Sequence, residues 1–380
     1  MSGGHRVALV SLPENRGGWS FGRLHLDFSL VSRPFTLPLY PMAESTRRTV
    51  SQDDSLPPVE PPSAAFLVQL FLVPAIIVAI IVAVWLAFHW LAQLGNDPEG
   101  YVRTLRRANE GRWQAALNLA NDLRGPGGAT LKADTTLAGD LAGILADEVA
   151  SGRPKLGGHA GEQSRTLCGY LCRALGEFTV PEAAAPLVAR VRDTGDPETA
   201  RAAVEALAVL DTNLTSSGRA FPDAAAVTDA LLTASRSDDA GLRSAAAFTL
   251  GVVGGAGADE RLEQLVGDAA DDVRYNAAIG LARQGREAAY PMLAEMLALP
   301  DAAAEPGDEA AQSQRYRRAL IVVNALKAVG LLVDAGVMPP ESVAQPLARL
   351  DDDPVGDVRA AASALAKKIE RVSAAADQSR

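Results

Sequence analysis

A long uncharged, apolar segment is the most prominent feature of the hydrophobic pattern. Residues 61–96 contain no Asp, Glu, Lys or Arg, and apolar residues dominate from Phe66 to Leu94. A helix needs about 20 apolar residues to cross the hydrocarbon core of a bilayer, and within lipid a helix satisfies its own backbone hydrogen bonds. The pattern therefore predicts one transmembrane helix over residues 64–95, with a mild kink at Pro74.

Two other interpretations of this segment stay open: a buried core helix of a soluble protein, and the apolar region of a cleaved signal peptide. Core helices rarely run this long without a charge. The apolar region is also longer than that of a signal peptide, and no clear small-residue cleavage site follows Trp90. Both points favour the membrane span.

Arginines on the two sides of the segment predict its orientation. Windows of about 20 residues hold more arginine after the span than before it, which places the C-terminal body in the cytoplasm. The predicted protein is thus a single-pass protein of the cell membrane. Arg103, Arg106 and Arg107 are also predicted to contact anionic lipid headgroups, at about 1 kcal/mol each. The arginines counted are Arg103, Arg106, Arg107 and Arg112 after the span, and Arg47 and Arg48 before it.

The two ends of the chain are predicted to be disordered. The predicted disordered head is residues 1–63. Residues 1–41 mix Gly, Pro and short apolar runs without a helical or strand period, and residues 51–63 carry four prolines and three acids. Met42 opens a polar stretch typical of a protein start, so we predict it to be the true initiator. The last residues, 372–380, are predicted to be a disordered tail.

The body between these ends, residues 97–371, contains a helical repeat. Three segments share an Arg, two residues, a small pair, two more residues and a Leu: residues 112–119, 243–250 and 274–281. Four further segments keep the small residues and the Leu. The resulting landmark leucines are about 41 residues apart on average, which is typical of two-helix repeats. They are Leu119, Leu175, Leu207, Leu250, Leu281, Leu326 and Leu365.

Apolar residues at helical spacing precede these segments and predict a first helix in each repeat. These first helices lie near residues 187–191, 262–265, 292–297 and 343–347. Helix starts are marked by acids that can cap the first turn. The predicted caps are Asp97, Asp196 and Asp353 before proline, and the pairs Asp238-Asp239 and Asp271-Asp272.

These residues resemble the HEAT-repeat family, in particular its short bacterial HEAT-like repeats. The resemblance rests on residues 238–255, 271–285 and 353–365, and covers residues 97–123 and 164–371. It implies an all-α fold: an α-solenoid of HEAT-like helix pairs, preceded by the transmembrane helix and the disordered head. It also implies a ladder of turn aspartates with helix arginines, here Asp271 with Arg274 and Asp238 with Arg243.

Two segments depart from the repeat. Between Leu119 and Leu175 the sequence predicts a glycine-rich turn at residues 124–128, a helix near residues 137–149 and a loop at residues 155–161. Residues 300–314 are predicted to be an acidic insertion.

The sequence offers little catalytic chemistry. The net charge is −10, and the body carries all of it, which disfavours nucleic acid as a partner. Cys168 and Cys172 are four apart and have no second pair to complete a zinc site, so two small buried residues are the simpler interpretation. His159 is predicted to be an exposed loop residue. No phosphate-loop, nucleophile-elbow or zinc-protease motif occurs, so we predict no cofactor, metal or catalytic residue.

The dense basic patch of the body is the predicted partner-binding site. Arg315, Tyr316, Arg317 and Arg318 follow the acidic insertion, and the alternative is an ordinary solvated helix start. We expect reversal of the three arginines to leave folding nearly intact, because exposed substitutions cost at most about 0.5 kcal/mol. The predicted function is a membrane-tethered scaffold that binds a protein partner on the concave side of the second helices. The alternatives are an enzyme, since some bilin lyases of the family branch carry such repeats, and a permanent subunit of a membrane complex.

Overall fold

The computed structural model describes residues 64–93, 98–107, 111–193, 195–301 and 308–378. Over these ranges the chain forms helices joined by turns, without strands, so the all-α prediction is confirmed there. The predicted head, Met42 included, lies outside the described residues. The chain divides into two units, with the long apolar helix in one and the helical body in the other.

Helix α1 (Ala64–Gln93) contains the apolar segment. Its residues Leu70–Ala87 have a mean hydropathy of 3.0 and none of them is buried. Of the helices in the described residues, it is the one long and apolar enough to cross a membrane, by length and composition. Pro74 lies inside the helix, as expected.

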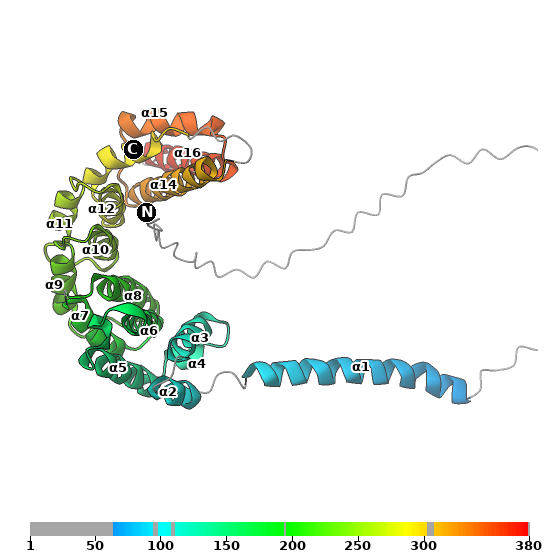
Figure 1. Ribbon diagram of the computed structural model, residues 1–380. Helices are drawn as coiled ribbons and strands as arrows, with labels where there is room; N and C mark the ends of the chain where they lie inside the picture. Colours follow the sequence, from blue (N-terminus) through cyan, green and yellow to red (C-terminus); the bar gives the residue numbers. More distant parts are fainter. Residues whose placement is uncertain (1–63, 94–97, 108–110, 194, 302–307, 379–380) are drawn as a thin grey trace, which may run out of the picture. The chain divides into compact units, whose positions relative to one another are not determined.

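The body consists of helix pairs, in which a first helix is followed by a second helix (Figure 1). The first helices are α2 (Pro98–Arg106), α5 (Thr135–Ala150), α7 (Ala184–Val191), α9 (Ala224–Ala234), α11 (Ala258–Leu265), α13 (Tyr290–Leu297) and α15 (Glu341–Arg349). The second helices are α3 (Arg112–Arg124), α6 (Gly158–Gly176), α8 (Pro197–Ser216), α10 (Ala240–Val253), α12 (Asp271–Arg283), α14 (Glu309–Asp334) and α16 (Gly356–Gln378).

Each second helix packs against the next one, from α3 through α16, so the second helices form one continuous row. The first helices pack along the other side, where α7 contacts α9 and α13 contacts α15. Within this body the second helices lie on the inner side of the curve that Figure 1 shows. The short helix α4 (Ala129–Lys132) lies in the loop after α3.

The core lies between the two rows and is built on the landmark positions. One landmark leucine lies in each second helix, and all of them are buried. The small pairs, such as Ala246 with Ala247 and Ala277 with Ala278, are also buried. Small side chains let the helices approach closely while each leucine fills the seam, at about 1.5–3 kcal/mol per buried leucine.

Two of the predicted helix caps are confirmed. Asp196 accepts a hydrogen bond from the Thr199 amide (3.2 Å), and Asp239 accepts one from the Leu242 amide (2.7 Å). The cap predicted at Asp271-Asp272 is wrong. Both residues lie inside the first turn of α12, and the Asp271 carboxylate is bound to Arg274 instead.

One predicted cap is untested, while another cap and the tail differ from the prediction. Asp97 lies outside the described residues. Asp353 accepts a hydrogen bond from the Val355 amide (2.9 Å) in the turn before α16, which begins only at Gly356. Helix α16 then continues to Gln378, beyond the predicted boundary at residue 371, because its alanine-rich end contains no helix breaker.

The predicted ladder of aspartates and arginines is correct for one pair and wrong for the other. Arg274 pairs with Asp271 (2.6 Å). Arg243 instead makes a bidentate pair with Asp268 (2.9 and 3.0 Å), a residue of the turn in the next repeat. It touches Asp238 only through the backbone carbonyl (3.0 Å). A planar guanidinium favours the carboxylate that can accept two parallel bonds, so this arginine links two repeats.

The inserted segments are more helical than predicted. Helix α5 contains the helix predicted over residues 137–149. The loop predicted over residues 155–161 ends early, because α6 already begins at Gly158. Likewise, α14 begins at Glu309 within the predicted insertion, after Asp308 caps it by accepting a hydrogen bond from the Ala311 amide (3.0 Å).

Candidate protein-interaction surface

The three arginines of the predicted patch lie in the first turns of α14, and each is paired within the chain. Their partners come from three different elements, so much of their charge is offset locally. Partner binding through these arginines stays a prediction. The pairs are Arg315 with Asp301 (2.7 Å), Arg317 with Asp272 (3.1 Å) and Arg318 with Asp353 (2.7 Å).

Arg318 is a structural residue. Its side chain is 10% exposed and that of Asp353 is 3% exposed. Its Nε also donates to the Leu299 carbonyl (2.8 Å). The expectation that reversing all three arginines leaves folding intact assumed exposed side chains, and Arg318 is buried instead. Its reversal would place two carboxylates together in a buried position.

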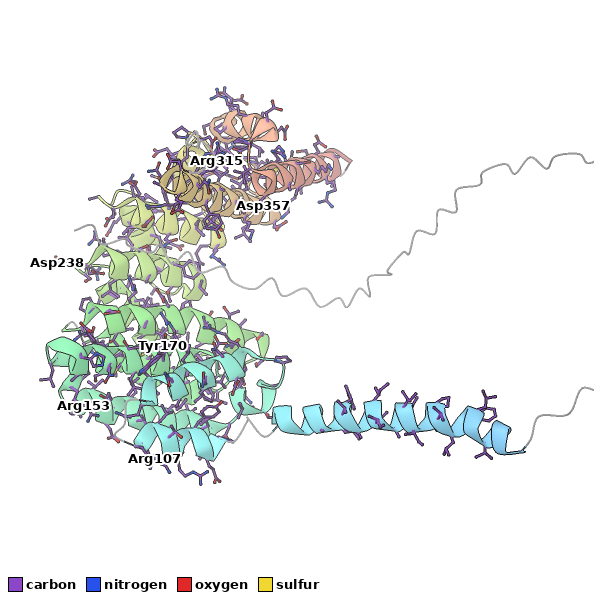
Figure 2. All side chains as sticks on the ribbon, turned by 45° about the vertical axis from the view of Figure 1, so that its right-hand side comes forward. Arg107, Arg153, Tyr170, Asp238, Arg315 and Asp357 are labelled. Atoms are coloured by element: carbon purple, nitrogen blue, oxygen red, sulfur yellow. The ribbon has the colours of Figure 1, made fainter. Side chains whose placement is uncertain are left out.

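Tyr316 differs from the arginines, since its side chain is 68% exposed. It borders a groove of about 330 Å³ between α14 and the start of α16. Tyr316, Ala319, Leu320 and Val323 fall on one side of α14 because they are three or four residues apart. Arg315 and Asp357, labelled in Figure 2, belong to the lining of the groove. The complete lining is Gln312, Arg315, Tyr316, Ala319, Leu320, Val323, Val355 and Asp357.

This groove has the chemistry of a protein contact. Its lining is mostly apolar and includes one cationic and one anionic side chain, and tyrosine combines a large apolar ring with a polar end. Aromatic residues in such surroundings carry much of the binding energy of protein interfaces. The sequence pointed to Tyr316 through its arginine neighbours, but the apolar face of α14 was not recognised as part of the site.

The three arginines predicted to contact lipid lie in and directly after α2. Arg103, Arg106 and Arg107 are all exposed, and Arg106 pairs with Asp140 (2.7 Å) on α5. Figure 2 shows Arg107 at the edge of the helical body. Their exposure is compatible with a lipid contact, which stays a prediction.

A buried carboxylate that the sequence did not reveal ties together the helices around α5. Glu148 is 1% exposed and accepts hydrogen bonds from Arg112 (2.7 Å), Arg153 (2.9 Å) and Ser164 (2.5 Å). Burial alone would raise the pKa of Glu148, but these hydrogen bonds outweigh it and lower the pKa to about 2. The cluster joins α3, α5 and α6, so its role is structural.

The described residues contain no group of three or more His, Cys, Asp or Glu side chains that could hold a metal ion. Cys168 and Cys172 are free and fully buried, as the sequence indicates. Burial raises the pKa of the Cys168 thiol to about 12 and also raises that of Cys172. A raised pKa disfavours the reactive thiolate, so both cysteines act as small core residues. His159 is exposed and hydrogen-bonds to Gln163 (2.8 Å) at the start of α6.

Comparison with known families agrees with the helix pairs. Residues 228–305 match the family of HEAT repeats. The match covers α10 through α13, which contain two of the three segments on which the sequence resemblance rests, and about a fifth of the chain.

Solved structures similar to this chain include human deoxyhypusine hydroxylase, at 21% identity and a TM-score of 0.28, covering 73% of this chain and 97% of that one. The Escherichia coli protein YibA has 14% identity and a TM-score of 0.38, with 75% and 96% covered. An engineered protein has 20% identity and a TM-score of 0.31, with 73% and 98% covered. Similarity at this level carries no argument about the function of this chain. A comparison with curated proteins found no match.

Proposed function

We propose that this protein is a membrane-tethered HEAT-repeat scaffold that binds a protein partner at the membrane surface. The observation that carries the proposal is the exposed Tyr316 at the apolar groove of α14, in a chain that also has an uncharged helix of membrane-spanning length. Repeat proteins present extended surfaces to partners. A tether to the bilayer would raise the effective concentration of such a surface near a membrane partner.

The tether is tested by extraction of membranes with alkaline carbonate. We expect the full chain to stay in the membrane fraction, because α1 offers more than the about 20 apolar residues that a span needs. Release into the soluble fraction would contradict the tether. A reporter fused after Arg380 tests the orientation, which we propose to be cytoplasmic from the arginines that follow α1.

The groove is tested by photo-crosslinking in intact membranes. Tyr316 is replaced by benzoylphenylalanine, and Leu331, which is 40% exposed on the same helix but outside the groove, is the matched control. We expect one adduct of defined mass from position 316 and none from position 331. Tyr316→Ala should weaken binding of that partner by about 2 kcal/mol, or roughly 30-fold. Equal adducts from both positions would contradict the groove as the binding site.

A further inference from the structure

A second surface of the body carries aromatic rings in contact with guanidinium groups. It lies on the second helices α3, α6, α10 and α12, away from the Tyr316 groove. We call it the arginine–aromatic face and define it by Trp113, Tyr170, Arg173, Phe248 and Arg283.

At the N-terminal end of this face, three side chains are stacked in succession. The rings of Trp113 on α3 and Tyr170 on α6 are 6.3 Å apart and inclined by 22°. The guanidinium of Arg173 lies over the Tyr170 ring, 5.4 Å from its centroid. Figure 2 labels Tyr170 within the row of second helices. Stacking orders a side chain that would otherwise move freely, so the position of this guanidinium is set before any partner arrives.

A second contact between a guanidinium group and an aromatic ring lies further along the row, this time between two neighbouring helices. The guanidinium of Arg283 on α12 lies over the ring of Phe248 on α10, at 5.3 Å. Neither Arg173 nor Arg283 forms an ion pair with any of the residues that the structure describes, although both are exposed.

These two arginines stand out because the body as a whole is acidic. Several other arginines of the body, such as Arg315 and Arg317 of α14, are paired with aspartates. Between Arg173 and Arg283, Arg201 and Glu205 of α8 form a loose pair at 3.8 Å, and the charge of Arg173 also acts on Glu205. The face therefore keeps an excess of positive charge in an otherwise negative molecule.

We propose that the arginine–aromatic face binds an extended acidic segment of a partner protein. The guanidinium groups supply planar donors that match carboxylates, and the rings supply apolar contact area. Arg173 and Arg283 are separated by three helix-to-helix steps of about 8–10 Å each, so by roughly 24–30 Å. An extended chain covers that distance with about nine residues.

The inference is tested with the full chain in nanodiscs of zwitterionic lipid, using fluorescein-labelled nonaglutamate as the probe. We expect the double variant Arg173→Gln, Arg283→Gln to weaken binding of the probe at least about tenfold, since two charge-assisted contacts are lost. The double variant Arg173→Lys, Arg283→Lys should be weakened less, because lysine keeps the charge but not the planar fork.

The matched control is the double variant Arg236→Gln, Arg349→Gln. Both arginines are exposed, one in the turn after the first helix α9 and one at the end of the first helix α15. This control should bind within twofold of wild type, and so should Tyr316→Ala, which separates this face from the groove. Absence of binding by wild type would overturn the inference, as would equal loss in the control. Equally tight binding of a nine-residue oligothymidine with the same dependence on Arg173 and Arg283 would assign the face to nucleic acid instead.

Discussion

The contact between α10 and α12 provides the sharpest test of the packing. Gly251 and Gly280 face each other where these two helices cross, and a Cβ added to Gly251 would lie 2.2 Å from the Gly280 Cα. Carbon atoms in contact lie about 3.5–4.0 Å apart, and the obstructing atom belongs to a backbone that cannot rotate away. Gly251→Ala therefore requires the helices to separate by roughly 1.5 Å, which is overpacking of a close contact.

We expect this variant to destabilise the α10–α12 contact by about 3 kcal/mol, the upper end of the usual cost of overpacking. The gain in helix propensity from glycine to alanine, about 1 kcal/mol, offsets only part of the strain. Gly280→Ala should cost less, because its Cβ would meet the flexible Leu262 side chain at 3.0 Å and the Gly251 Cα at 3.2 Å. Gly139→Ala in α5 is the matched control, since nothing lies within 4 Å of its added Cβ.

Amide hydrogen exchange of the full chain, followed by mass spectrometry, measures the effect locally. A loss of about 3 kcal/mol corresponds to roughly 100-fold faster exchange in peptides from α10 and α12. Peptides from α5 should exchange more slowly in the Gly139→Ala variant, by a few-fold. Unchanged exchange in α10 and α12 of the Gly251→Ala variant would show that the two backbones are not in contact, and would refute this account of the repeat interface.

Two further predictions concern buried charge. Glu148→Gln should speed exchange in α3, α5 and α6 by roughly 100-fold, because its two arginine partners lose their counter-charge at a cost of about 3 kcal/mol. The pKa of Glu148 is lowered from 4.5 to about 2. The stabilisation that its carboxylate provides is therefore present at neutral pH and is lost as the pH falls from about 4.5 towards 2. If the wild type loses stability over this pH range no faster than Glu148→Gln, the assignment is contradicted. Arg318→Glu should destabilise α14 and α16 by about 3–5 kcal/mol because it faces the buried Asp353, whereas Arg317→Glu, at an exposed pair, should cost about 1 kcal/mol or less. Similar thermal unfolding of these last two variants would show that Arg318 is not buried in solution.

The helical architecture was largely predictable from local sequence. The landmark leucines and the small pairs recur along the chain, and each of these leucines is buried in a second helix. A helix buries residues that are three or four apart, so its apolar face is visible in the order of residues alone. The length and lack of charge of the apolar segment predicted α1 by the same reasoning, while its insertion in a membrane stays a proposal.

The candidate site was only partly predictable. The sequence singled out Tyr316, but it presented Arg318 as an exposed neighbour of Arg317. In the folded chain the two arginines point to different aspartates, one buried with Asp353 and the other exposed with Asp272. Neighbouring residues on a helix differ by about 100° in direction, so burial depends on what packs on each side.

What the sequence alone determined is therefore the type of each helix and the face it buries, because both follow from residues within a few turns of one another. What only the tertiary structure decided is the partner of each residue across the repeats. Arg243 chooses Asp268 rather than Asp238, Gly251 meets Gly280, and Arg283 lies over Phe248. These contacts join residues 25 to 35 positions apart. They depend on the angle and distance at which neighbouring helices pack, and no local pattern of residues encodes that geometry.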